Sequence, residues 1–87
     1  MPGADLHGVN FSDADMERVV LRGANLQHAS LRGVYLLDAD LRSADLRDAN
    51  LLNVRLSGAD VTDSRFGSNY SLSAEEKQDL AARGAIL

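Results

Sequence analysis

Histidine, serine and acidic residues are the side chains of this 87-residue sequence whose chemistry could serve a site. Imidazole nitrogens and carboxylate oxygens are ligands for Zn²⁺, and His7, His28 and Asp48 qualify by type. His28 follows His7 by 21 positions and Asp48 follows His28 by 20. These side chains can share a site only if the fold brings the three positions together. Even in such a fold, the histidines could either form a weak metal site at the surface or stay solvated without a metal. We expect solvated histidines and no metal site.

Nucleophilic catalysis finds little support in the sequence. Serine, histidine and aspartate all occur, but the serines stand at turn-like or outward positions, and no cleft that would orient a triad is indicated. Neither a P-loop nor a dinucleotide fingerprint is present. We therefore predict no catalytic residue, no cofactor and no enzymatic activity.

The element that must position all these residues is a five-residue phrase, clearest at 39–52, which reads ADLRSADLRDANLL. Stepping by five from Leu41 in both directions reaches thirteen consecutive apolar centres. They are Leu6, Phe11, Met16, Leu21, Leu26, Leu31, Leu36, Leu41, Leu46, Leu51, Leu56, Val61 and Phe66. Two positions before each centre stands Ala or Val, except at Ser64. The phrase thus spans most of the chain.

A period of five fits neither standard element. On an α-helix, five residues advance about 500°, which would spread the centres around the whole circumference. On a flat strand, alternate centres would point to opposite faces. The centres stay together only if the chain turns by a fixed amount in each repeat and stacks coil upon coil. The sequence therefore predicts an all-β solenoid.

Turn-forming residues recur with the same period. Eight positions just before a centre are Asp or Asn, whose short side chains bond nearby backbone. They are Asp5, Asn10, Asp15, Asn25, Asp40, Asp45, Asn50 and Asp60. Glycines at the last position of the phrase, such as Gly33 and Gly58, permit left-handed corner angles. We expect one turn in every repeat.

The pattern A(D/N)LXX, seen as ADLHG, ANLQH, ADLRS, ADLRD and ANLLN, resembles the pentapeptide-repeat family over residues 4–68. The resemblance implies a right-handed quadrilateral β-helix with four pentapeptides to a coil, and hence about three coils. The centre and small side chains would fill the interior and leave no pocket for a substrate. On such a coil His7 and His28 fall on the same side.

The register ends after Phe66, and the last residues read differently. Ser73 followed by Glu76 is a capping box that opens a helix of about ten residues, and Gly84 stops it. We expect this helix to cap the C-terminal end of the solenoid, using an apolar side formed by Leu72, Leu80, Ala81, Ile86 and Leu87. The predicted organisation is a lead-in at 1–3, the repeats at 4–68, and a connector with the capping helix at 69–87.

The N-terminal end has no equivalent cap in the sequence. The first coil would present an open edge around Leu6, Phe11 and Met16. Three explanations stay open: Pro2 blunts the edge, two chains meet end to end as a homodimer, or the chain is a piece of something larger. These three apolar residues are candidates for an end contact.

The outward columns carry a second candidate surface. Val20, Tyr35, Leu37 and Leu52 are apolar at positions that should be polar, and they form a candidate contact patch for a protein partner. Isolated exposed apolar residues are also normal.

Charge and composition narrow the partners. The repeats hold ten acidic residues against seven arginines, a net of −3 within a chain of net charge −4, which disfavours direct nucleic-acid binding. No cysteine, basic leader or apolar run of roughly 18 residues occurs, so we expect a cytoplasmic protein with no membrane contact.

Two functions follow from these features. The first is a non-enzymatic structural or protein-interaction module with an unknown partner. The second comes from the resemblance, because longer family members mimic duplex DNA and bind DNA gyrase. B-DNA carries one charge per roughly 1.7 Å of axis, so the net of −3 is far too small and the mimic is disfavoured.

Overall fold

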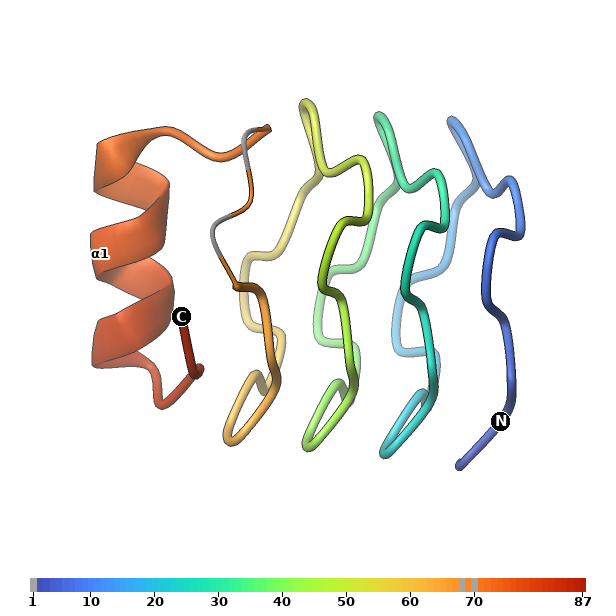
Figure 1. Ribbon diagram of the computed structural model, residues 1–87, viewed down its shortest axis with the longest axis horizontal. Helices are drawn as coiled ribbons and strands as arrows, with labels where there is room; N and C mark the ends of the chain where they lie inside the picture. Colours follow the sequence, from blue (N-terminus) through green and yellow to red (C-terminus); the bar gives the residue numbers. More distant parts are fainter. Residues whose placement is uncertain (1, 68, 70) are drawn as a thin grey trace.

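The computed structural model describes residues 2–67, 69 and 71–87. The chain winds from one end of a short rod to the other and finishes beside a helix that lies across the far end (Figure 1). The Cα extents are 26 × 20 × 19 Å. The helix, α1, spans Ala74–Ala82. Met1, the predicted last repeat residue Ser68 and the predicted connector residue Tyr70 lie outside the described residues.

Residues twenty positions apart lie side by side in parallel bridges. The series begins with Asp5 beside Asn25 and continues every five residues to Asp45 beside Arg65. A coil therefore takes twenty residues, or four five-residue segments. Each segment contributes a single bridging residue, and no longer strand forms among the described residues. The predicted return every twenty residues is confirmed, although turns make up most of the coil.

A left-handed backbone at every fifth residue makes the corners. All positions from Gly3 to Asp63 in this register have φ between +56° and +72°. The left-handed corners predicted at glycines are confirmed at Gly33 and Gly58, and eight residues other than glycine adopt them as well. Five of those eight are Asp or Asn, which tolerate this conformation better than most side chains.

The Asp and Asn side chains just before the centres bond the backbone two residues ahead. In each case the side-chain oxygen accepts from the N–H of residue i+2, as Asp40 does from Arg42 at 3.2 Å. All eight predicted positions make this bond. The bond holds the turn that leads into each corner, which confirms the role assigned to these residues.

The core is a stack of the predicted centres, and its burial changes along the rod. The centres from Leu21 to Leu51 are all 0% exposed, and the small residues from Ala24 to Ala44 are at most 1% exposed. Burying a leucine contributes about 1.5–3 kcal/mol. In the first coil, by contrast, every centre and small residue is only half-buried. Phe66 is buried at the C-terminal end, whereas Phe11 is not.

Helix α1 begins as its sequence predicts. The Ser73 hydroxyl accepts from the Glu76 N–H at 3.1 Å, and the Glu76 carboxylate accepts from the Ser73 N–H at 2.9 Å. Gly84, with φ +95°, follows the C-cap residue Arg83. The predicted apolar side is only partly right, because Leu72 and Leu80 are buried while Ile86 and Leu87 are about half exposed.

Candidate functional site

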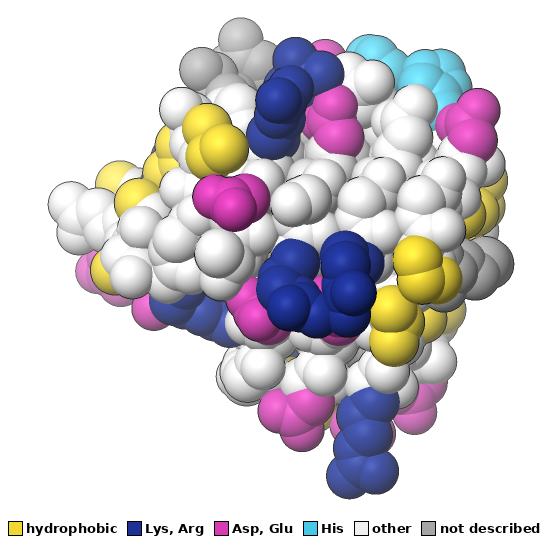
Figure 2. Space-filling model, turned by 90° about the horizontal axis from the view of Figure 1, so that it is seen from below, with side chains coloured by type: hydrophobic (Ala, Val, Ile, Leu, Met, Phe, Trp, Pro, Cys, Tyr) yellow, Lys and Arg dark blue, Asp and Glu magenta, His cyan; other side chains and the backbone are white. Residues whose placement is uncertain are grey.

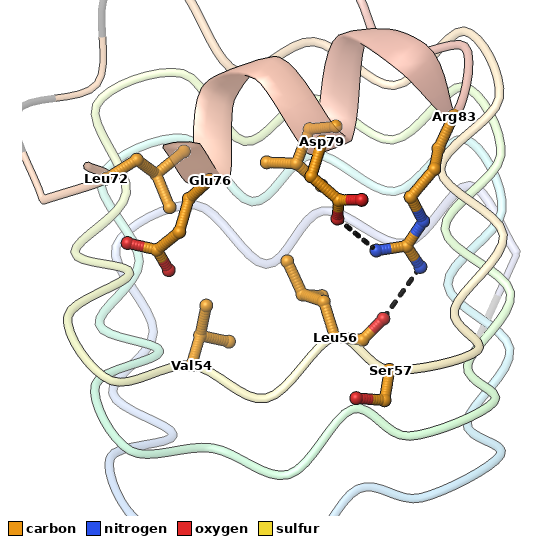
Figure 3. Close-up of a pocket in the computed structure, with 8 residues that line it drawn as sticks. Val54, Leu56, Ser57, Leu72, Glu76, Asp79 and Arg83 are labelled. Atoms are coloured by element: carbon orange, nitrogen blue, oxygen red, sulfur yellow. Dashed lines mark hydrogen bonds and ion pairs between the residues drawn. The ribbon is translucent and has the colours of Figure 1, made fainter. Parts of the chain in front are cut away.

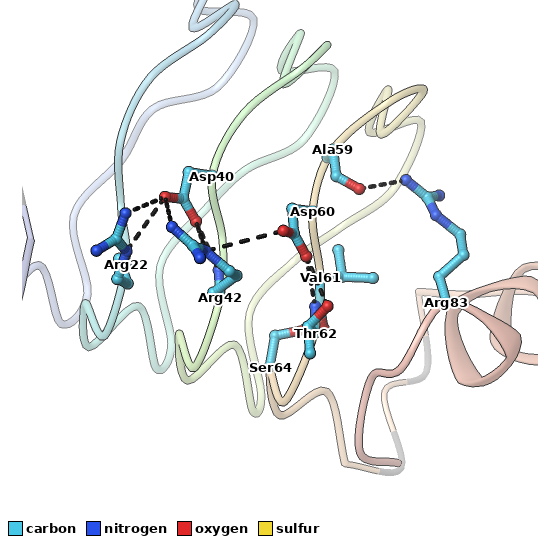
Figure 4. Close-up of polar contacts among 9 residues, drawn as sticks. All are labelled: Arg22, Asp40, Arg42, Ala59, Asp60, Val61, Thr62, Ser64 and Arg83. Atoms are coloured by element: carbon cyan, nitrogen blue, oxygen red, sulfur yellow. Dashed lines mark hydrogen bonds and ion pairs between the residues drawn. The ribbon is translucent and has the colours of Figure 1, made fainter.

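Arginines and aspartates of neighbouring coils form a charged ladder on one side of the rod (Figure 4). Asp40 is held by Arg42 through two bonds of 3.0 Å and by Arg22 of the preceding coil at 2.9 Å. Arg42 also approaches Asp60 of the following coil at 3.8 Å. The Arg42 guanidinium, with help from Arg22, holds the pKa of Asp40 well below its usual range.

Two more aspartates are held in their charged form. The hydrogen bond from the Arg47 side chain lowers the pKa of Asp45. The Thr62 hydroxyl and N–H lower the pKa of Asp60. Asp40 and Asp45, at least, are therefore neutralised within the protein by arginine. They are poorly placed to act as free charges toward a ligand.

The two histidines meet as the coil geometry predicts. Their ring centroids are 5.2 Å apart in an edge-to-face arrangement, and His28 Nε2 lies 3.8 Å from Asp48 Oδ2. The His28 side chain is 57% exposed. Across residues 2–67, 69 and 71–87, no group of three His, Cys, Asp or Glu side chains is arranged to hold a metal ion. The two histidines therefore form a ring contact at the surface of the protein.

Several serine hydroxyls form hydrogen bonds within the β-helix. Ser64, which replaces the small apolar residue in its repeat, is buried and donates to the Val61 carbonyl at 2.6 Å. Ser12 and Ser30 bond each other across neighbouring coils at 2.7 Å. Neither arrangement joins a serine to a histidine and an acid in the manner of a nucleophilic site.

At the C-terminal end, polar side chains form hydrogen bonds with main-chain groups of the last coil. The Asn69 amide donates to the Ala49 carbonyl at 2.8 Å, and the Ser71 hydroxyl accepts from the Leu51 N–H at 2.8 Å. Arg83 donates to the carbonyls of Leu56 and Ala59 at 2.7 and 2.6 Å. One coil earlier, the groups equivalent to those of Ala49, Leu51 and Ala59 bond main-chain groups of the following coil.

The chain end completes this edge. Ile86 forms a parallel bridge with Arg65, and its N–H donates to the Ser64 carbonyl at 2.7 Å. Between α1 and the last coil lies a hollow of about 160 Å³ with Val54 and Leu56 on its floor (Figure 3). Asp79 and Arg83, paired at 3.1 Å, stand at its rim.

The N-terminal end is built differently. Leu6, Phe11 and Met16, the predicted end-contact residues, are half-buried and pack on the core from its outer end. The main-chain N–H and C=O groups of Asp5, Asn10 and Asp15 form no hydrogen bond within the described residues. The same groups of Asn25, Ser30 and Tyr35, one coil later, are all bonded to the first coil. Among the described residues, the edge of the last coil is therefore bonded by side chains and by the chain end, whereas three residues along the edge of the first coil are not bonded.

The residues predicted as a lateral patch lie in different columns of the coil. Val20 is beside Asp40, and Tyr35 is between Asp15 and Arg55, whose guanidinium lies 6.0 Å from the tyrosine ring centroid. Val20, Tyr35 and Leu52 are 39–44% exposed, and Leu37 is half-buried. Whether the four act as one contact patch stays a prediction. On the face in Figure 2, dark blue and magenta side chains are interspersed.

The repeat and its coil define the class: a solenoid of five-residue segments with paired small and large side chains inside. The family model for pentapeptide repeats matches residues 3–36 and 35–67, with 8 copies. The chain belongs to the pentapeptide-repeat family, and membership implies a right-handed β-helix.

Solved structures include similar proteins. A pentapeptide repeat protein from Nostoc Pcc 7120 is 33% identical, with 94% of this chain and 74% of that chain covered and a TM-score of 0.51. A pentapeptide repeat protein of the Arabidopsis thaliana thylakoid lumen is 22% identical, with coverage of 95% and 79% and a TM-score of 0.41. No curated protein matches the sequence.

The described part of the chain contains no helix with the length and apolar character needed to cross a bilayer.

Proposed function

We propose that this chain is a non-enzymatic protein-interaction module whose contact surface is its N-terminal end. Its working unit is a quadrilateral β-helix of about three coils over residues 4–68. The connector and α1 within residues 69–87 act as a cap. One observation carries the proposal: the first coil leaves its apolar residues half-buried and the main-chain groups of Asp5, Asn10 and Asp15 without a bond among the described residues, while the far end is covered. Exposed strand edges of this kind are pairing surfaces.

The expected contact is weak. A Cα cross-section of 20 × 19 Å gives roughly 400 Å² per copy in an end-to-end pair, or about 800 Å² in total. Stable interfaces bury about 1,200 Å² or more. Self-association is therefore expected between about 10 µM and 1 mM, and measurements must reach that range.

Light scattering over this concentration range, with three proteins, tests the proposal. The wild type should rise above its monomer mass of 9.4 kDa. Phe11→Asp places a charge on the half-buried end and should remain a monomer. The double variant Leu37→Asp with Leu52→Asp changes only the lateral patch and should associate like the wild type. Far-ultraviolet spectra check that all three are folded.

Each other outcome has a clear meaning. A wild type that keeps a mass of 9.4 kDa at every concentration overturns the N-terminal end as a self-contact. Loss of association in the lateral double variant alone transfers the contact to Val20, Tyr35, Leu37 and Leu52.

A DNA-mimicking binder of DNA gyrase or another DNA-binding protein is disfavoured by charge. A duplex as long as the 26 Å axis of the protein carries roughly 15 phosphate charges. The chain has a net charge of −4, and Asp40 and Asp45 are already paired with arginine. A gyrase supercoiling assay at micromolar protein should show no effect, and inhibition would revive the mimic.

A further inference from the structure

The open edge offers paired donors and acceptors on the same residues. In the second coil, the N–H of Asn25 donates to the Ala4 carbonyl at 2.9 Å, and its C=O accepts from the Leu6 N–H at 2.8 Å. Both groups of Asn25 therefore face the N-terminal end. Asp5, Asn10 and Asp15 hold the equivalent positions one coil earlier, where neither group has a bond among the described residues.

Such residues match an antiparallel partner. In an antiparallel ladder, a hydrogen-bonded pair consists of two residues that exchange both N–H···O bonds. A single extended peptide would satisfy only one side of the square end. A second copy of this chain, turned over about a two-fold axis, presents the same groups on more than one side at once, from Asp5, Asn10 and Asp15, and in the opposite chain direction.

We propose that two copies pair end to end through this edge, with Asp5 of one copy opposite Asn10 of the other. The proposal rests on the proposed function, because it takes the N-terminal end as the contact surface. It adds the occupant, the strand direction and the register. The contact is then a continued β-helix ladder with an apolar centre.

Charge selects the register. A two-fold axis across a square end runs through the middles of two opposite sides or through two opposite corners, which gives four arrangements. An axis through the side of Asn10 sets Asp5 against Asp15 of the second copy. An axis through the side of Asp5 sets Asp5 against itself and Asp15 against itself. Carboxylates directly opposite each other are destabilising, so both side-centred arrangements are disfavoured.

The two corner arrangements differ in their corner residues. One pairs Asp5 with Asn10 and brings Glu17 of each copy opposite Arg18 of the other. The alternative pairs Asn10 with Asp15 and brings His7 opposite Arg18, which gains no ion pair. Glu17 and Arg18 are exposed, and neither has an ion-pair partner among the described residues. The first arrangement supplies that partner twice.

The interior fits the same register. It places Ala4 opposite Phe11 and Leu6 opposite Val9 of the second copy, so a small side chain meets the largest one on this end. All four are half-buried in one copy. End-to-end pairing would cover these four side chains in both copies.

Cysteine cross-linking tests the register without background, because the chain has no cysteine. Paired residues in such a ladder have Cα atoms about 5.5 Å apart, within the range of about 4.4–6.8 Å for a disulfide. We expect Asp5→Cys alone and Asn10→Cys alone to stay uncross-linked under mild oxidation. An equal mixture of the two should give a disulfide-linked dimer that reducing agent separates.

Other results overturn the register. Cross-linking of Asn10→Cys with itself would place the axis through a side. Absence of a cross-link in the mixture, with scattering still showing association that Phe11→Asp abolishes, would reject the pairing and leave the proposed function standing. A monomer in scattering would reject both.

Charge reversal gives an independent readout that introduces no cysteine. Arg18→Glu sets acids of the two copies against each other twice at this corner and should weaken association at least tenfold at low salt. Adding Glu17→Arg to the same chain restores opposite charges between copies and should recover the wild-type association. Equal association by the single and double variants would contradict the Glu17 to Arg18 contact.

Discussion

Arg83 should contribute more to stability than its surface ion pair suggests. Its guanidinium donates to the Leu56 and Ala59 carbonyls at 2.7 and 2.6 Å and to Asp79 at 3.1 Å. Hydrogen bonds from a charged group contribute about 1.5–3 kcal/mol each. The Arg83 side chain is 27% exposed, so water can reach part of this region, and the lower half of the range applies. With two bonds to carbonyls at about 1.5–2 kcal/mol each, Arg83→Ala should lower the free energy of unfolding by about 3–4 kcal/mol.

Asp79→Ala is the matched control. It removes the exposed i,i+4 ion pair but leaves both carbonyl bonds, and should cost about 0.3–0.5 kcal/mol. Urea unfolding followed by far-ultraviolet circular dichroism measures both variants by linear extrapolation. In a chain of this size, 1 kcal/mol shifts Tm by about 4–8 °C, so the two variants should separate clearly in thermal unfolding. Equal losses in the two variants would show that the bonds from Arg83 to the last coil add nothing.

Three further predictions concern the coil itself. Leu41→Ala empties the middle of the stack at a residue 0% exposed and should cost about 2.7–5 kcal/mol in urea unfolding; a loss under 1 kcal/mol would mean that the stack collapses around the gap. Asp40, whose pKa is lowered by Arg42, adds stability above its ordinary pKa of 3.8 and loses it as pH falls below that value. The difference in stability between wild type and Asp40→Asn should therefore be constant from about pH 7 to 5 and shrink below about pH 4, and a difference that grows on acidification would refute the pairing. Gly58→Ala puts a Cβ against Asp38 Oδ1 at φ +72°, whereas Gly8→Ala has the same backbone strain at φ +71° and open space, so Gly58→Ala should be the more destabilising of the two in the same assay.

Local and periodic features were predictable from the sequence. Each centre, such as Leu41, lies in an environment repeated every five residues, so one geometric argument places the whole stack. Asp40 bonds the backbone only two residues ahead, and the Ser73 and Glu76 capping box spans three residues. Short-range bonds of this kind depend little on the rest of the fold.

Contacts that depend on how separate elements meet were not predictable. Arg83 lies at the end of the helix, where nothing in the local sequence indicates that its bonds reach 27 and 24 residues back to Leu56 and Ala59. Likewise, Asn69 reads as a connector residue, and nothing local indicates that its amide replaces a coil's N–H at Ala49. The only available signal was the expectation that the last coil needs partners for its edge.

The position of these unpredicted contacts indicates where recognition can occur. Along its sides, the β-helix satisfies itself, because each coil bonds the next and Asp40 is already held by Arg22 and Arg42. A ligand at the sides would have to displace those bonds or accept a surface of mixed charge. At the C-terminal end, Arg83 and Asn69 occupy the carbonyls that a partner would use. At the N-terminal edge, by contrast, the main-chain groups of Asp5, Asn10 and Asp15 have no bond among the described residues and lie beside half-buried apolar side chains, so a partner that paired with these three residues would displace no main-chain bond that the structure shows for them.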